Sequence, residues 1–191
     1  MLEFLEKEHL YLKNGVLVKS VTQILELIFP NKYKNVDKEI LNKKAEFGTQ
    51  GHAIIEHLDL NNTDIVENLN LMGYSGELIQ CIEEYINLCK TFKIEPLEHE
   101  KKVSYEYLYA GTLDLIANVD GIESLCDIKF TYKCDKEYLS WQLGMYALAL
   151  GKKFKKYYCV WLPKNKTGQL IEIVPKTKEE ILKKLEELGI L

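Results

Sequence analysis

Apolar and polar residues alternate most clearly along residues 109–129, on both sides of the pair Asp120-Gly121. An Asp-Gly pair between two strand-like runs is typical of a β-hairpin, because a type I′ turn requires positive φ at both central positions. If these two residues form the turn, the register places Asp114 opposite Asp127. One face of the hairpin is then apolar and is expected to belong to the core.

The other face of this hairpin is expected to carry Thr112, Asp114, Ile116, Leu125, Asp127 and Lys129. Directly opposed side chains in an antiparallel pair lie about 4.5–5.5 Å apart at Cβ, where like charges destabilise the sheet. A divalent cation between the two carboxylates would remove this repulsion, and carboxylate oxygens suit Mg²⁺ or Mn²⁺. The alternative is a solvated strand face on which Asp114 pairs with Lys129 and nothing is bound.

The remaining hydrophobic pattern predicts helices and strands in a mixed order. Ser20 with Gln23 forms a capping box, as does Thr177 with Glu180. The expected elements are a hairpin around Asn14-Gly15, helices over 20–29, 37–58, 77–92, 138–150 and 177–188, and strands within 96–107, 157–162 and 169–174, with a polar loop over 61–76. This order predicts an α/β fold in a single domain, 1–191, with a central mixed β-sheet flanked by helices and a helical N-terminal part.

The helix predicted over 37–58 contains two glycines, Gly48 and Gly51, followed by His52 and Glu56. Each glycine costs a helix about 1 kcal/mol relative to alanine, so we expect another backbone or a phosphate to approach the helix there. His52 and Glu56 are four residues apart and therefore share one face of the helix. Such a pair is more often a surface contact than a set of ligands.

Composition and charge exclude several classes of protein. The 191 residues are 47% hydrophobic and 28% charged, with a net charge of −4, which does not indicate a globally basic nucleic-acid binder. We expect a cytoplasmic protein, because no apolar run is long enough for a membrane span and the start lacks the pattern of a secretory signal. The five cysteines are scattered, which predicts reduced thiols instead of disulfides or a zinc site. Six lysines and no acidic residue between 151 and 170 predict one positive edge, or simply a solvated face.

Three motifs stand out in combination: Gly111-Thr112-Leu113-Asp114, then Asp127-Ile128-Lys129, and then a helix with Gln142 and Tyr146. Together they resemble the PD-(D/E)XK nuclease superfamily, in its RecB-like and phage-type exonuclease branch. The segment from Gly48 to Glu56 is similar to the branch's Gly-x-x-x-His…Glu helix, and Glu100 stands where the family has a glutamate. The resemblance spans about residues 9–162 and implies a restriction-endonuclease-like core.

The resemblance implies a role for each matching residue. Asp114, Asp127, His52 and the Ile128 carbonyl would bind Mg²⁺ or Mn²⁺, and Lys129 would orient the attacking water. Glu100 and Glu56 would support the site or bind a second metal, while Gln142 and Tyr146 would hold the site and the nucleic-acid backbone. Asp127 departs from the glutamate that many relatives have. Some relatives hold an iron–sulfur cluster through four cysteines, but no such cluster is expected here, because only Cys159 follows the Gln142–Tyr146 helix.

The implied function is a metal-dependent deoxyribonuclease, a phosphodiester hydrolase that is expected to act as an exonuclease in phage or prophage DNA recombination and repair. Its partners would be single- or double-stranded DNA and a recombinase, annealing protein or helicase. The sequence leaves open a structure-selective endonuclease, a catalytically inactive nucleic-acid-binding module on the same fold, and a homo-oligomer.

Overall fold

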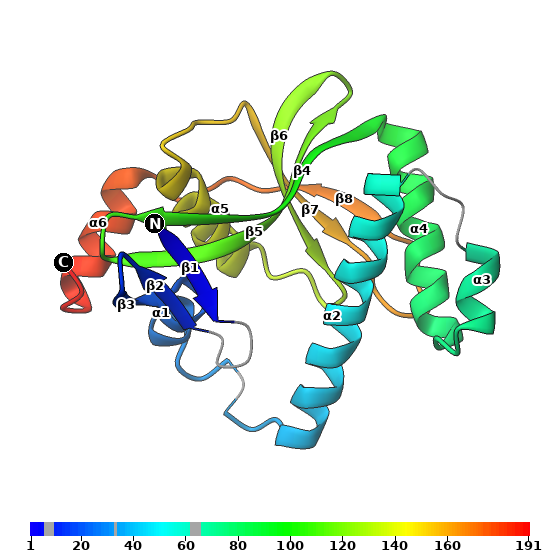
Figure 1. Ribbon diagram of the computed structural model, residues 1–191, viewed down its shortest axis with the longest axis horizontal. Coiled ribbons are helices and arrows are strands. Elements are labelled where there is room, and N and C mark those ends of the chain that lie inside the picture. The colour runs from blue at the N-terminus through cyan, green and yellow to red at the C-terminus, as the bar shows by residue number, and fades with distance from the viewer. Residues whose placement is uncertain (6–9, 33, 62–65) are drawn as a thin grey trace.

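The computed structural model describes residues 1–5, 10–32, 34–61 and 66–191 (Figure 1). The elements along the chain are β1 (Leu2–Leu5), β2 (Leu10–Lys13), β3 (Val16–Ser20), α1 (Val21–Ile28), α2 (Lys38–Asn61), α3 (Val66–Leu71), α4 (Gly76–Phe92), β4 (Ile94–Tyr105), β5 (Tyr109–Val119), β6 (Ile122–Lys129), α5 (Lys136–Leu150), β7 (Lys156–Trp161), β8 (Gln169–Glu172) and α6 (Lys178–Glu187). The predicted α/β class is therefore confirmed. None of the described helices has the length and apolar character needed to cross a membrane.

The described strands form an eight-stranded mixed sheet in the order β1-β2-β3-β5-β6-β7-β8, with β4 paired to β5. The antiparallel neighbours β4, β5 and β6 lie at its centre. Two contacts are parallel, between β3 and β5 and between β6 and β7. Because β3 and β6 pair with opposite ends of β5, the N-terminal hairpin reaches the same strand that carries Asp114.

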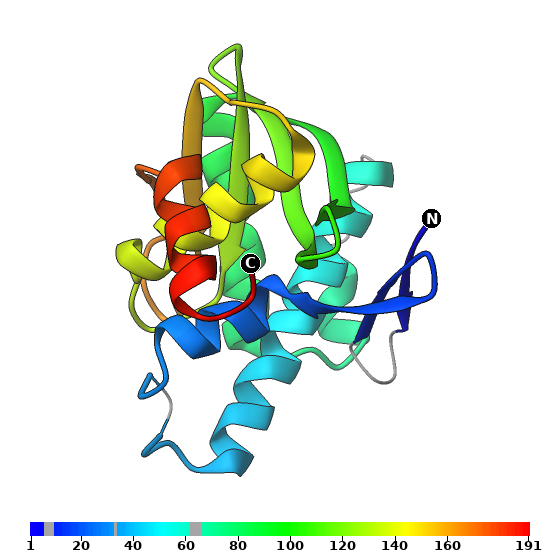
Figure 2. The same cartoon turned by 90° about the vertical axis from the view of Figure 1, so that its left-hand side faces the viewer.

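Helices cover both faces of this sheet (Figures 1 and 2). One face packs against α1, α5 and α6 through a core that includes Leu25, Leu143 and Ile181. The other face packs against α2, α3 and α4 through a core that includes Ile55 and Ile82. Both faces of the central hairpin are therefore buried, and a polar side chain on it such as Asp127 is shielded from water.

The predicted turn and register of the hairpin are confirmed close to the turn. Asp120 and Gly121 have φ values of 48° and 77°, as a type I′ turn requires. Pairing runs from Val119–Ile122 to Leu115–Cys126. The β-ladder ends there, one step before Asp114 and Asp127, so the expected direct opposition of these two residues is absent from the described pairing.

In the first half of the chain, one element was not predicted and one prediction was wrong. Leu2–Leu5 forms β1 beside β2, a stretch for which no element was predicted. Within the segment predicted as a polar loop, Val66–Leu71 forms α3, and Leu69 is fully buried against the core shared with α4. A short helix of this kind is stabilised by that tertiary contact more than by its own sequence.

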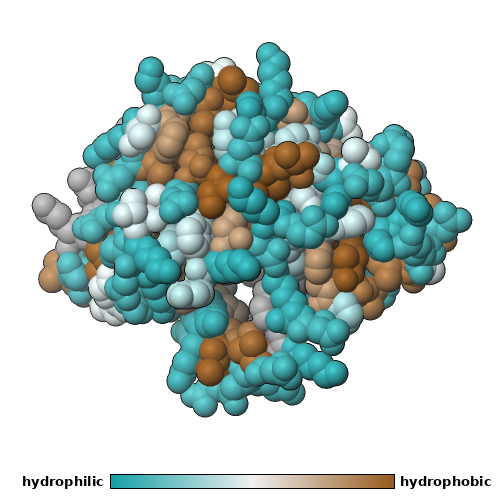
Figure 3. Space-filling view, turned by 180° about the vertical axis from the view of Figure 1, so that it is seen from behind, coloured by the Kyte–Doolittle hydropathy of each residue, from teal (hydrophilic) through white to brown (hydrophobic). Residues whose placement is uncertain are grey.

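The first half of α2 projects from the rest of the molecule. Figure 3, which views the molecule from behind, shows it as a lobe below the body with a gap between them. The buried residues of this helix, from Gly51 to Leu58, all lie in its second half. The second half is therefore fixed against the sheet, and it is this half that carries His52.

Candidate metal centre

His52 is held at the sheet by an aromatic ring that packs over the preceding glycine. A Cβ atom on Gly51 would lie 2.3 Å from the Cζ atom of Phe130, so the ring would have to move to admit it. The Phe130 ring also contacts the His52 imidazole edge to face, with ring centres 5.6 Å apart. Gly51 thus accommodates an aromatic side chain, whereas another backbone or a phosphate was expected at this position. Gly48 has no such neighbour within 4 Å.

Asp114 and Glu100 lie on the adjacent strands β5 and β4, at a local distortion of both. The pairs on either side, His99–Leu115 and Lys101–Leu113, bracket these two acids. Glu100 has φ of 43°, a strained conformation for a residue with a side chain, and such strain is common at functional sites.

The alternation of side chains along β5 shifts by one residue at the same place. Leu113 and Ile116 pack into the same core, whereas Leu115 packs into the core on the opposite face. Side chains three apart on a regular strand point to opposite faces. The predicted common face for Asp114, Ile116 and Asp127 is therefore wrong, because it assumed unbroken alternation.

The distortion brings His52, Glu100 and Asp114 together. The Nδ1 atom of His52 lies 3.8 Å from Glu100 Oε1 and 3.9 Å from Asp114 Oδ2. One ligand atom from each residue can be chosen so that all three lie within 4.8 Å of one another. Two carboxylates and one imidazole are a suitable donor set for a divalent cation, and three ligands leave positions for water or substrate.

The electrostatics of this group favour a bound cation. Burial lowers the pKa of His52, against the opposing effect of Asp114, so the imidazole is neutral at pH 7 and can donate a lone pair. Burial raises the pKa of Glu100 to about 7, and the negative charges of Asp114 and Glu56 contribute to the same shift. A cation would relieve both the burial of the carboxylate and its repulsion by its neighbours.

Asp127 occupies a different environment from the one predicted. Its carboxylate is 1% exposed, and Oδ2 lies 2.6 Å from Lys129 Nζ. Burial raises the pKa of Asp127 to about 7, although Lys129 opposes the shift. Asp127 does not belong to the group of potential ligands that includes Asp114. Its predicted role as a metal ligand thus remains a prediction, and the structure shows it as the partner of Lys129.

Lys129 remains charged at this position. Burial lowers its pKa, but the carboxylates of Asp127 and Asp114 more than compensate, so the net shift is upward. The predicted alternative in which Lys129 pairs with Asp114 differs from the structure, where its ion pair is with Asp127.

Ile128 contributes through its backbone. Its amide donates a hydrogen bond of 2.7 Å to Asp114 Oδ2, which fixes that carboxylate at the point where the β-ladder ends. Its backbone also interacts with the His52 imidazole and raises the pKa of that ring, against the larger lowering by burial. The residue whose carbonyl is predicted as a metal ligand therefore lies beside the proposed histidine ligand.

Gln142 and Tyr146 lie on α5, on the other side of the acidic residues. Gln142 Nε2 lies 3.4 Å from the Tyr146 hydroxyl, and Gln142 Oε1 is buried without a hydrogen-bond partner among the described residues. Burial raises the pKa of Tyr146, with smaller contributions from Asp114 and Asp127, so its hydroxyl stays protonated. The ring packs against Gly111, where a Cβ would lie 2.8 Å from it.

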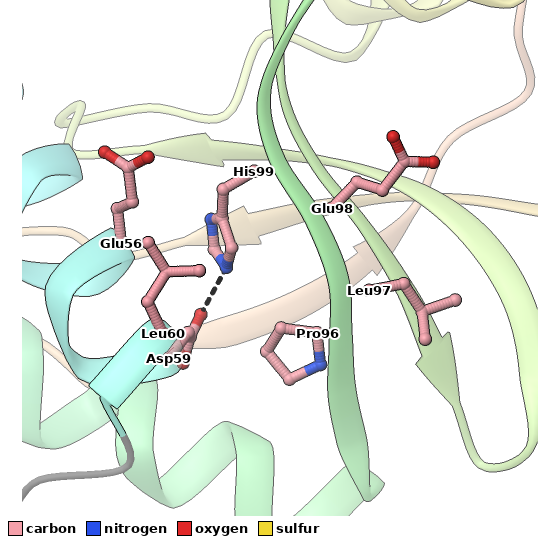
Figure 4. A pocket seen from close by; sticks show the side chains of 7 residues that line it. All are labelled: Glu56, Asp59, Leu60, Pro96, Leu97, Glu98 and His99. Atoms are coloured by element: carbon pink, nitrogen blue, oxygen red, sulfur yellow. Dashed lines mark ion pairs between the residues drawn. The ribbon is translucent and has the colours of Figure 1, made fainter.

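A buried polar network behind the site was not predicted from the sequence. A pocket of about 320 Å³ lies between α2 and β4, and His99 and Asp59 are among the residues that line it. Figure 4 shows these two side chains joined by an ion pair. His99 Nε2 lies 2.9 Å from Asp59 Oδ2, and the Tyr85 hydroxyl donates a 2.6 Å hydrogen bond to the same oxygen. This network joins α2 to β4 and so supports the position of His52 relative to Glu100. Glu56, predicted as a supporting residue, also lines this pocket.

Tyr11 is a second residue near the site that the sequence did not reveal. Its hydroxyl lies 2.9 Å from the Thr112 hydroxyl, two residues before Asp114. Burial raises its pKa, and the charge of Glu100 contributes to the shift. The parallel pairing of β3 with β5, which no local pattern indicates, places the hairpin here.

Of the two readings of the lysine-rich stretch, a positive edge or a solvated face, the ion pairs favour the solvated face. Three of its lysines pair with glutamates from elsewhere in the chain: Lys152 with Glu123, Lys156 with Glu172 and Lys164 with Glu77. Exposed pairs of this kind contribute little stability, but they reduce the local positive potential.

Comparison with known proteins gives no family for this chain. No protein-family model matches it, and no curated protein matches it. Among solved structures, it is similar to that described as "Crystal structure of SSO0001", with 15% sequence identity and a TM-score of 0.45, over 91% of this chain and 75% of the other. A proposal about function therefore has to rest on the geometry of the site and on its chemistry.

Proposed function

We propose that this protein is a Mg²⁺- or Mn²⁺-dependent deoxyribonuclease. The observation that supports the proposal most directly is the convergence of His52, Glu100 and Asp114 beside the Asp127–Lys129 ion pair. The first three residues would hold the cation. A cation held there would lower the pKa of a water molecule and neutralise charge on a phosphodiester as it is cleaved.

Lys129 supplies the second component of this chemistry. It remains protonated, and its ammonium group is fixed by a carboxylate that is itself almost completely buried. A fixed positive charge stabilises the negative charge that develops on phosphate oxygens in the transition state. Asp127 therefore acts as a positioning residue in this proposal.

The resemblance to RecB-like and phage-type exonucleases leads us to propose DNA as the substrate, exonucleolytic cleavage as the activity, and phage or prophage recombination as the setting. An endonuclease selective for DNA structure would use the same residues. A binding module without catalysis is the competing function, and it would retain affinity for DNA without cleaving it.

Substitution of Asp114 by Asn tests the proposal. The amide oxygen can still accept the hydrogen bond from the Ile128 amide, so the fold should be preserved while the charge for metal binding is lost. We expect cleavage of end-labelled DNA in Mg²⁺ or Mn²⁺ to fall by a factor of about 100 or more, the scale on which loss of electrostatic stabilisation slows such reactions. Resolving the products over time also separates exonuclease from endonuclease action.

Asp120→Asn is the matched control. This substitution removes the same charge as Asp114→Asn, but in an exposed hairpin turn, where the φ of 48° suits asparagine. Equal activity of the two variants would refute the proposed metal centre. DNA binding without cleavage by the wild-type protein in either metal would favour the binding module.

A further inference from the structure

Three aromatic residues lie on the segments next to the proposed metal centre, and we call them the aromatic ledge: Phe47, Phe130 and Tyr132. Phe130 contacts His52 at one end, and Phe47 packs edge to face against Phe130 with ring centres 6.0 Å apart. Tyr132 follows two residues after Phe130 and is 81% exposed. An aromatic ring that is so exposed has stacking surface available for a ligand.

Two lysines lie over the rings of this ledge. Lys164 Nζ is 3.8 Å from the centre of the Phe47 ring, and Lys166 Nζ is 4.4 Å from the centre of the Tyr132 ring. Lys164 also pairs with Glu77, whereas Lys166 has no carboxylate within 4.0 Å among the described residues. The positive charge over Tyr132 is therefore available to an anionic ligand.

The loop that carries these lysines is fixed to α4. Gln80 accepts a hydrogen bond from the Asn165 amide and donates one of 2.9 Å to the Lys166 carbonyl. Glu84 accepts a 2.7 Å hydrogen bond from the Gly168 amide. These contacts position Lys166 before any ligand arrives, which lowers the entropic cost of binding.

The segment that carries Tyr132 is also held in place. The Trp161 indole donates a 2.7 Å hydrogen bond to the Thr131 carbonyl, and the Thr131 hydroxyl donates one of 2.9 Å to the Lys133 carbonyl. The backbone on both sides of Tyr132 is thereby fixed while its ring stays exposed. The ledge is a preformed surface with an exposed ring and a cation at its outer end.

We infer that the aromatic ledge binds single-stranded DNA, with a base stacked on Tyr132 and a phosphate at Lys166, and leads the strand to the metal centre. Proteins that bind single strands combine aromatic platforms with positive charge in this way, because every base has a face that can stack. A duplex conceals its base faces and could use only the charge. This inference deepens the proposed function and rests on it for the direction of the strand toward the site.

Binding of a fluorescein-labelled oligothymidylate of about 15 nucleotides, a length within the range of known single-strand sites, tests the inference when followed by anisotropy in EDTA. We expect Tyr132→Ala to weaken binding about 10-fold, as the loss of one stacked base does, and Tyr132→Phe to retain the affinity of the wild type. Lys166→Ala should weaken binding and reduce its dependence on salt. Because Tyr132 is exposed, thermal unfolding of its variants should match that of the wild type.

Two matched controls separate the ledge from general surface effects. Tyr107→Ala removes another exposed tyrosine beside a lysine, at the turn between β4 and β5, and Lys153→Ala removes another exposed lysine. If Tyr132→Ala and Tyr107→Ala bind the oligonucleotide equally well, the inference is wrong. Equal affinity for a blunt duplex, with equal sensitivity to Tyr132→Ala, would also overturn it.

The assay contains no metal, so its outcome is independent of the catalytic test. Loss of binding in Tyr132→Ala together with absence of nuclease activity in the wild type would retain the ledge and reject the proposed enzyme. Unchanged binding in Tyr132→Ala together with loss of cleavage in Asp114→Asn would reject the ledge and retain the proposed enzyme.

Discussion

Asp114 and Asp127 are the same residue type on neighbouring strands, but their surroundings differ in burial and in partners. Asp114 accepts a hydrogen bond from a backbone amide and lies beside a neutral histidine and a second acid. Asp127 is almost completely buried and lies against an ammonium group. The first is arranged to share a cation with other ligands, whereas the second already has a cation in Lys129.

This difference shows how two carboxylates can serve one reaction in separate ways. When the environments of paired acids differ, their protonation and their roles differ too. In the proposed enzyme, Asp114 belongs to the metal ligands and Asp127 holds the catalytic ammonium. The same difference predicts that substitutions at the two places have different consequences for stability and for metal binding.

Removal of Lys129 should have the largest effect on stability. Lys129→Ala leaves the Asp127 carboxylate buried without its partner, which costs about 3–5 kcal/mol in comparable cases. The loss should be greater at pH 8 than at pH 5, because burial raises the pKa of Asp127 to about 7 even while Lys129 opposes the shift, so without Lys129 the carboxyl is protonated and neutral at the lower pH. Urea denaturation at the two pH values measures it.

Asp127→Asn combined with Lys129→Ala provides the control, because the double variant leaves no charged side chain buried without a partner. It should recover much of the stability lost by Lys129→Ala at pH 8. A Lys129→Ala protein as stable as the wild type at that pH would show that the ion pair does not distinguish Asp127 from Asp114.

A methyl group on Gly51 should produce an intermediate loss of stability. Gly51→Ala places a Cβ against the Phe130 ring, and overpacking of this kind costs about 1–3 kcal/mol. Displacement of Phe130 would also move His52, so Mn²⁺ binding, measured by calorimetry, should weaken. Gly48→Ala is the control, because its Cβ meets no atom within 4 Å.

Replacement of Phe130 by a smaller residue tests whether the clash is the cause. Phe130→Leu combined with Gly51→Ala should be less destabilised than the sum of the single variants. If the destabilisation of the double variant equals the sum of the two single variants, the packing argument is wrong. Other contacts would then hold His52 in place.

Removal of the Glu100 charge should give the smallest change in stability, and this change should be a gain. Burial raises the pKa of Glu100 from 4.5 to about 7, so the folded state binds its proton more tightly than the unfolded state does. This contribution is fully present below pH 4.5 and is lost as pH rises through about 7. Without metal, Glu100→Gln should therefore be more stable than the wild type at pH 8 and equal to it at pH 4.5.

The expected gain at pH 8 is about 1 kcal/mol after allowance for the partial exposure of the side chain, or about 2–4 °C in melting temperature. Melting curves in EDTA give this difference, and Glu95→Gln, at an exposed position on the same strand, should show none. In Mn²⁺ the order should reverse, because the wild type gains stability from the bound cation. A Glu100→Gln variant that Mn²⁺ stabilises as much as the wild type would remove Glu100 from the ligand set.

The sequence alone determined the elements whose signals are local. The Asp120-Gly121 turn, the capping boxes at Ser20 and Thr177, and the helices and strands of the second half follow from spacings of a few residues. Asp114 was selected as a candidate partly from the register of the Asp120-Gly121 hairpin, whereas His52 and Glu100 were selected through the resemblance to the RecB-like nucleases. Turn chemistry and amphipathic periodicity require no knowledge of distant segments.

Only the tertiary structure decided which candidates meet and which do not. The shift of alternation at Asp114, the strained φ of Glu100 and the capture of Asp127 by Lys129 result from packing between strands and helices far apart in the sequence. The contacts of Tyr11, Asp59 and His99 likewise depend on how β2, α2 and β4 are brought together. The physical reason is that burial and long-range pairing set the direction and charge of a side chain, and neither is encoded in its immediate neighbours.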